Sequence, residues 1–180
     1  MSDYSGDGVY EILPKHAQDM RLKVWGGAST AGTPIKLYPC TPGAKNTQFV
    51  IVAAGSTQGK PEKGDCEYLI IAVDSGLYVA ANAYLTNLHP ITYRADAIQV
   101  TTELRSPLDL SIRWKLRHAG NGAFYIENVG TGKQLNVRGA GKETGMEVIT
   151  YAPTESAENA QFILKHLGKH KDHPELKPIE

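Results

Sequence analysis

The sequence lacks several features that define whole classes of protein. Its 180 residues carry no net charge, because 19 Lys and Arg balance 19 Asp and Glu. Proteins that bind nucleic acids or anionic membranes take much of their affinity from Lys and Arg that neutralise phosphates, so the balance argues against both. Apolar runs such as Tyr68–Val73 fall far short of the ~20 residues of a membrane-spanning helix. We therefore expect no nucleic-acid partner and no membrane insertion.

Targeting and metal-binding signals are also sparse. The first residues, MSDYSGD, are polar and acidic and resemble no secretory signal, so we expect a cytoplasmic protein. The two cysteines, Cys40 and Cys66, are then expected to be reduced, although the sequence does not decide whether they pair. No CxxC pair is present, and we expect neither a metal site nor a cofactor. The histidines His166, His170 and His173 are interpreted as a solvated group that would bind a transition metal only weakly.

Long amphipathic helices are missing as well, because no segment of ten or more residues keeps a 3.6-residue apolar period. An internal repeat is present instead. A shift of 113 residues places Leu22–Phe49 on Leu135–Phe162 without a gap, with ten identical positions of 28. The identities include two glycines, a tyrosine and the N-x-Q-F ending, which indicates an internal duplication.

A third, more diverged copy lies between these two. The three copies open with the alternating apolar pattern of a half-buried strand, at Tyr10–Ile12, Tyr68–Ile70 and Phe124–Ile126. Each closes on a large aromatic residue that we expect in the core, at Phe49, Trp114 and Phe162. The middle copy has no recognisable third strand and carries insertions around Asn87–Pro90 and Leu104–Asp109.

The copies predict an all-β fold of about twelve short strands, four in each copy, arranged as a closed structure without exposed edges. In the first copy we expect strands over Val9–Leu13, Arg21–Trp25, Pro34–Tyr38 and Phe49–Ala53. The predicted domain covers residues 1–167, with repeats at about 8–53, 66–116 and 122–166. Residues 168–180 form a charged tail with two prolines, which is poorly ordered by default.

The repeated motifs resemble those of the ricin-B-type β-trefoil lectins. They are a Tyr-x-Ile strand, the L-x-V-x-G-G turn, the G-T-P-[IV]-x-[LI]-[WY] strand and the N-x-Q-[FW] close. The opening GVYEILPKHAQDMRLKVWGG and the middle EYLIIAVDSGLYVAANA are most similar to small fungal members, of the sclerotial agglutinin type. This resemblance covers roughly Gly8–Lys165 and implies a β-trefoil with threefold pseudo-symmetry. It also implies binding of galactose and N-acetylgalactosamine.

The resemblance places a shallow sugar site in each repeat, with a polar side chain after the second strand, an aromatic on the third and an asparagine near the close. In the first repeat it implies Lys23, Trp25, Gly26, Gly27, Lys36, Tyr38 and Asn46. In the third repeat it implies Asn136, Arg138, Gly139, Tyr151 and Asn159. A pyranose packs its C–H face on an aromatic ring and needs fixed polar partners for its hydroxyls, which these residue types supply.

Two alternatives for these residues stay open. The asparagines also suit the closing turn, where they would bond the backbone, and the tyrosines also suit a half-buried strand. Many family members have Asp where this chain has Lys23 and Asn136, and lysine donates hydrogen bonds but cannot accept them. In the middle repeat Tyr78 lies at or near that acidic position without a matching strand, so we expect no sugar binding in this repeat.

Catalytic motifs are not found: there is no G-x-S-x-G elbow, and the glycine-rich turns lack phosphate-loop spacing. We therefore predict a non-catalytic lectin for glycans ending in galactose or N-acetylgalactosamine. Useful avidity would need two copies of a site, supplied by two repeats or by a homodimer. The resemblance further implies a storage or defence role. The alternative is a β-trefoil protease inhibitor acting through Ala54–Asp65 or Leu85–Pro90, and a heparin-binding trefoil is disfavoured by the zero net charge.

Overall fold

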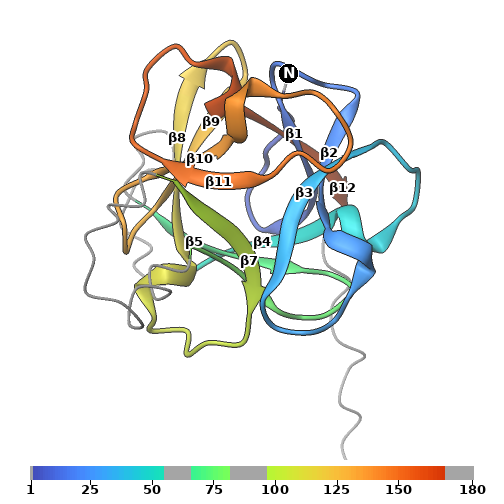
Figure 1. Cartoon of the computed structure of the whole chain (residues 1–180). Helices are drawn as coiled ribbons and strands as arrows, with labels where there is room; N and C mark the ends of the chain where they lie inside the picture. The colour runs from blue at the N-terminus through green and yellow to red at the C-terminus, as the bar shows by residue number, and fades with distance from the viewer. Residues whose placement is uncertain (1, 55–65, 82–96, 169–180) are drawn as a thin grey trace, which may run out of the picture.

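The computed structural model of the chain describes residues 2–54, 66–81 and 97–168, which form twelve strands joined by turns (Figure 1). The strands are β1 (Gly8–Pro14), β2 (Met20–Val24), β3 (Thr33–Pro39), β4 (Gln48–Ala53), β5 (Glu67–Ala72), β6 (Tyr78–Ala81), β7 (Ile98–Glu103), β8 (Arg113–Gly120), β9 (Ala123–Asn128), β10 (Gln134–Val137), β11 (Val148–Tyr151) and β12 (Phe162–Gly168). Short 3-10 turns are η1 (Trp25–Gly27), η2 (Lys45–Thr47), η4 (Leu110–Ile112), η5 (Arg138–Ala140) and η6 (Glu158–Ala160). Within the described ranges, no helix is long and apolar enough to cross a membrane.

Six strands close into a barrel. Strand β1 pairs with β4, β4 with β5, β5 with β8, β8 with β9, β9 with β12, and β12 returns to β1, all antiparallel. The other six strands form three hairpins, β2–β3, β6–β7 and β10–β11. The inner strands of these hairpins, β3, β7 and β11, meet around the centre of Figure 1. Strand β7 pairs with both β3 and β11, and a bridge between Lys36 and Glu147 completes the triangle. This is the β-trefoil that the repeats predict.

The hydrophobic core is built from equivalent residues of the three copies. Phe49, Trp114 and Phe162 are fully buried, as expected from their place at the end of each copy. The indole Nε1 of Trp114 donates to the carbonyl of Val79 at 2.9 Å, which satisfies its buried polar atom. Around these rings pack apolar residues from all three copies: Ile12, Ile70, Ile126, Leu22, Val79, Leu135, Ile35, Val100 and Val148. Equivalent residues of the three copies therefore share one interior, and a single copy could not bury its apolar face alone.

Two local expectations were wrong. We placed Trp25 at the end of a strand, but β2 ends at Val24 and Trp25 begins the turn η1, where Gly26 and Gly27 adopt φ of 67° and 64°. The left-handed glycine pair turns the chain before a further strand residue can pair. We also expected no third strand in the middle copy, but β7 is present and pairs with β6 and both neighbouring hairpins. Its sequence, IQVTTE, favours a strand, because four of its six residues are β-branched. It was missed because it lacks the Gly-x-x-[Ile/Val] pattern that opens the third strand in the other two copies.

Several sequence-based interpretations lie outside the described residues. These are nearly all of the proposed inhibitory loop at 54–65, the whole of the one at 85–90, the insertion at 87–90, the tail beyond residue 168, and His170 and His173. Among the described residues, no group of three or more His, Cys, Asp or Glu side chains could hold a metal ion. Cys40 is exposed and Cys66 is buried, and the two do not form a disulfide.

Candidate functional site

The third repeat has a pocket where the cap hairpin β10–β11 meets the closing turn η6. All five residues predicted for this repeat line it: Asn136, Arg138, Gly139, Tyr151 and Asn159. Its volume is about 290 Å³, which is close to the lower end of the range for small-molecule sites. Strand β10 supplies Asn136, β11 supplies Tyr151, and η6 supplies Asn159, so three segments of the repeat converge on it.

A hydrogen bond between two amides organises this pocket. The Asn159 Nδ2 donates to the Val137 carbonyl at 2.9 Å and to the Asn136 Oδ1 at 3.0 Å. Because a carbonyl oxygen can only accept, the atom of Asn159 at this point must be its nitrogen, and the Asn136 atom facing it must then be oxygen. The remaining atoms, Asn136 Nδ2 and Asn159 Oδ1, have no hydrogen bond to a described residue. The pair thus offers one amide donor and one amide acceptor to a ligand.

The other two walls supply an aromatic ring and a cation. Tyr151 lies at the end of β11 and is 40% exposed, which is unusual for so large a side chain. The Arg138 Nε donates to the Glu147 Oε2 at 2.6 Å, and this exposed ion pair fixes the guanidinium at the rim. A ring beside one donor and one acceptor matches the needs of a pyranose: a surface for its C–H face and partners for its hydroxyls.

The first repeat brings its predicted residues together differently. The Lys23 Nζ lies 3.6 Å from the centre of the Tyr38 ring, and the Lys36 Nζ lies 4.7 Å from that of Trp25. Both are cation–π contacts, and each places an ammonium over a ring that was predicted to contact sugar. Lys23 and Lys36 are neighbours in the β2–β3 register, which is why both cations gather at this site.

The asparagine of the first repeat is also held differently. Gly27 adopts a left-handed conformation, and a Cβ at this position would lie 3.2 Å from the Asn46 Nδ2. Asn46 therefore packs on the bare backbone of the η1 turn, and Gly27 leaves room for it. Its side chain makes no hydrogen bond to another described residue, whereas Asn159 makes two. Gly26 completes the same turn.

The middle repeat has neither an aromatic nor an amide at the three matching positions. Tyr78 pairs with Glu103 in β7, as Arg21 pairs with Tyr38 and Gln134 with Tyr151. We expected Tyr78 at or near the acidic position; it lies two residues before that position, which Ala80 occupies. The register then gives Ala80, Glu103 and Ser111 as the counterparts of Asn136, Tyr151 and Asn159.

Sequence reasoning missed part of the pocket wall in the third repeat. Thr154 and Ala157 line it as well, and both are identical to their counterparts in the first repeat, Thr41 and Ala44. That identity was a signal that could have found them. Ala97, by contrast, comes from the middle repeat and reaches the pocket only because β7 pairs with β11. No sequence pattern points to it.

The closed barrel, the triangular cap and a polar pocket beside an exposed ring in one repeat define a β-trefoil of the lectin type. The model of the family described as ricin-type beta-trefoil lectin domain-like matches residues 45–151 and 110–171. The chain belongs to this family. No curated protein matches it.

Several solved structures are similar over most of this chain. The designed threefold symmetric protein ThreeFoil has a TM-score of 0.69 at 23% identity, over 88% of this chain and 98% of its own. The agglutinin of Rhizoctonia solani has a TM-score of 0.68 at 18% identity, over 92% and 99%. The C-terminal half of an earthworm R-type lectin, in complex with GalNAc, has a TM-score of 0.59 at 17% identity, over 88% and 98%. At these identities, the similarity shows the fold.

The same fold also occurs as one part of larger chains. This chain spans 18% of a mosquitocidal holotoxin and 31% of an exo-beta-1,3-galactanase from Clostridium thermocellum. Those relationships again concern the fold, and it is membership of the ricin-type lectin family that supports carbohydrate binding.

Proposed function

We propose that the protein is a non-catalytic lectin that binds terminal galactose or N-acetylgalactosamine in the pocket of the third repeat. One observation carries the proposal: the Asn136–Asn159 hydrogen bond leaves an amide donor and an amide acceptor beside the exposed ring of Tyr151. The bound N-acetylgalactosamine in the earthworm lectin supports the same class of ligand. A role in defence or storage belongs to this proposal.

Specificity would come from the axial 4-hydroxyl of galactose and N-acetylgalactosamine. Glucose carries this hydroxyl equatorially, so a donor and acceptor placed for the axial group stay unpaired when glucose is bound. Unpaired polar groups in a binding site reduce affinity far more than a missing apolar contact. We therefore expect both galactose-type sugars to bind and glucose to fail.

The test is calorimetric titration of the purified protein with galactose, N-acetylgalactosamine and glucose. Tyr151→Ala removes the ring and should weaken binding of the first two sugars roughly 10-fold or more, which corresponds to about 1.4 kcal/mol. Tyr38→Ala is the matched control in the first repeat and should leave binding nearly unchanged. Equal binding of glucose would contradict the specificity, and unchanged binding in Tyr151→Ala would contradict the site.

A further inference from the structure

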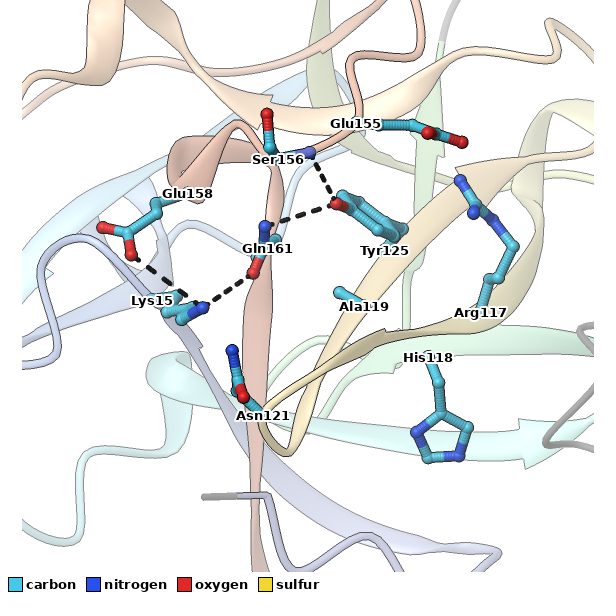
Figure 2. Close-up of a pocket in the computed structure, with 10 residues that line it drawn as sticks. All are labelled: Lys15, Arg117, His118, Ala119, Asn121, Tyr125, Glu155, Ser156, Glu158 and Gln161. Carbon is cyan, nitrogen blue, oxygen red and sulfur yellow. Dashed lines mark hydrogen bonds and ion pairs between the residues drawn. The ribbon is translucent and has the colours of Figure 1, made fainter.

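A second, larger pocket lies next to the pocket of the third repeat, and residues of the segment 154–159 line both. The end of β8, the start of β9, the turn after β1 and the segment before β12 surround it, with a volume of about 580 Å³ (Figure 2). This segment divides its residues between the two pockets. Thr154, Ala157 and Asn159 face the first pocket, whereas Glu155, Ser156 and Glu158 face the second.

The floor of this pocket is a buried, hydrogen-bonded tyrosine. Tyr125 is 5% exposed, and its hydroxyl accepts hydrogen bonds from the Ser156 backbone N–H at 3.0 Å and from the Gln161 Nε2 at 3.3 Å (Figure 2). Both lone pairs of the phenol oxygen are then occupied, and its own proton remains for another partner. Gln161 is 4% exposed and also accepts from the Lys15 Nζ at 3.0 Å. The floor is therefore rigid and presents one hydroxyl donor.

Arg117 lies beside this tyrosine and has no carboxylate partner in the part of the chain that the structure describes. The Arg117 Cζ lies 4.7 Å from the centre of the Tyr125 ring, and among the described residues it forms neither an ion pair nor a hydrogen bond. Lys15 differs, because its Nζ lies 3.9 Å from the Glu158 Oε1. This cation–π contact holds the guanidinium beside the ring, and its N–H groups, which bond no described residue, suit a carboxylate in two parallel hydrogen bonds.

The rim offers acceptors to the rest of such a ligand. Glu155 and Glu158 are both exposed at the edge of the pocket and can accept hydrogen bonds from hydroxyl groups. Arg117 lies over the Tyr125 ring, which is itself buried, so a neutral sugar has no exposed ring on which to stack. A ligand with an anionic group for Arg117 and hydroxyls for the glutamates would pair with all three side chains.

We infer that this pocket is a second ligand site that binds a carboxylated monosaccharide, with the carboxylate on Arg117 and the Tyr125 hydroxyl and the ring hydroxyls on Glu155 and Glu158. It is independent of the proposed galactose site, since none of the residues lining one pocket lines the other.

The test is a titration followed by amide chemical shifts in NMR spectra, with D-glucuronate, D-glucose and acetate as probes. Glucuronate and glucose share a pyranose ring and differ in the carboxylate, whereas acetate has the carboxylate without the ring. Glucuronate should shift the amides of residues 117–125 and 155–161. Glucose should not, and acetate should bind at least 10-fold more weakly than glucuronate.

Variants assign the binding to this pocket. Arg117→Gln should weaken glucuronate binding at least 10-fold. Arg117→Lys keeps the charge but loses the paired N–H donors of the guanidinium, so it should bind glucuronate more tightly than Arg117→Gln and more weakly than the wild type. Tyr125→Phe removes the hydroxyl and should weaken binding less, with thermal unfolding as the check on the loop that the hydroxyl holds. Tyr151→Ala should leave glucuronate binding unchanged, so a failure of the galactose site is distinguishable from a failure here.

Three results would overturn the inference. Equal shifts with glucose would show that the carboxylate is not recognised, and equal affinity for acetate would reduce the pocket to a simple anion site. Unchanged glucuronate binding in Arg117→Gln would place the ligand elsewhere on the protein.

Discussion

The first and third repeats carry the same tyrosine and asparagine at positions 113 residues apart, but they use them differently. In the third repeat, Asn136 and Asn159 bond each other beside an exposed Tyr151 and line a pocket. In the first, Lys23 stands in place of Asn136, and its ammonium covers the Tyr38 ring at 3.6 Å. One substitution between equivalent strands thus replaces an open ring and an amide pair by a cation–π contact.

The first and third repeats also differ in their buried polar contacts. In the first repeat a buried ion pair joins the Glu11 Oε2 to the Arg21 Nε at 2.9 Å. The third repeat has neutral Gln134 at the position of Arg21, and its Oε1 accepts from the Thr154 N–H at 3.2 Å. Tyr10 pairs with Phe49 and Phe124 with Phe162, so Tyr125 takes the place of Glu11. At these buried positions the first repeat therefore has an ion pair and the third has neutral polar groups, and this distinction can be tested.

The largest effect should come from Glu11→Ala. It leaves the buried Arg21 without its carboxylate, and we expect a loss of about 3–5 kcal/mol in the free energy of unfolding. Gln134→Ala in the third repeat should cost about 1–2 kcal/mol, because a neutral hydrogen bond is lost. Urea unfolding of both variants measures the difference. The double variant Glu11→Met with Arg21→Met should recover most of the loss; equal losses in the two repeats would contradict the distinction.

The next effect separates the two asparagines. Asn159→Ala removes two hydrogen bonds and leaves the Val137 carbonyl without its partner, so we expect a loss of about 1–3 kcal/mol. Asn46→Ala should stay within about 0.5 kcal/mol, since its side chain bonds no described residue. The measurement is again urea unfolding, with the slope of the transition compared between variants. If Asn46→Ala proved as damaging as Asn159→Ala, the two closing turns would be equivalent after all.

Removing the lysine that covers Tyr38 should create a sugar site in the first repeat. Lys23→Asn uncovers the Tyr38 ring and places an amide beside Asn46, as in the third repeat. We expect a second galactose site, raising the stoichiometry from one to two, with about 0.5–1 kcal/mol of stability lost with the cation–π contact. Calorimetry in the Tyr151→Ala background gives the clearest readout, because any binding restored there must come from the first repeat. No recovery in that background would show that Lys23 is not what closes the site.

The smallest effect concerns the closing turn of the middle repeat. Asp109 caps η4 by accepting from the Ser111 backbone N–H at 2.9 Å, whereas the equivalent caps in the other repeats are Ala44 and Ala157. Asp109→Ala should cost about 0.5–1 kcal/mol at pH 7, near the low end for a cap because solvent screens it. Ala157→Asp should add a similar amount.

The cap should also depend on pH. The Ser111 backbone N–H holds the pKa of Asp109 below its ordinary value of 3.8, with a smaller contribution from Arg105. A lowered pKa stabilises the folded state above the unfolded pKa and loses that contribution as pH falls through the folded pKa. The difference between the wild type and Asp109→Ala should therefore be full at pH 7 and shrink below about pH 4. Urea unfolding at pH 7 and pH 3 measures it, and a difference independent of pH would argue against a charged cap.

The fold was predictable because the residues that form the core recur in each of the three copies. Phe49, Trp114 and Phe162 close the three copies, and each is fully buried in one shared interior. The missed strand β7 shows the limit of this reasoning: its sequence, IQVTTE, is rich in β-branched residues, but it lacks the repeated Gly-x-x-[Ile/Val] pattern by which the third strands were sought. The five residues predicted for the third repeat line one pocket, because the 113-residue step maps strand onto strand without a gap, and their binding of sugar stays a prediction.

The sequence by itself determined the β-trefoil, the equivalence of the repeats and the residue types at each candidate site. Tertiary structure alone decided which rings are open, because a lysine on a neighbouring strand can reach Tyr38 and no sequence spacing tells whether it does. It also decided that Ala97 of the middle repeat joins the third-repeat pocket, and that Lys15 and Arg117 meet around Tyr125. These contacts cross between repeats, and their geometry is set by how the closed barrel and its cap bring distant segments together.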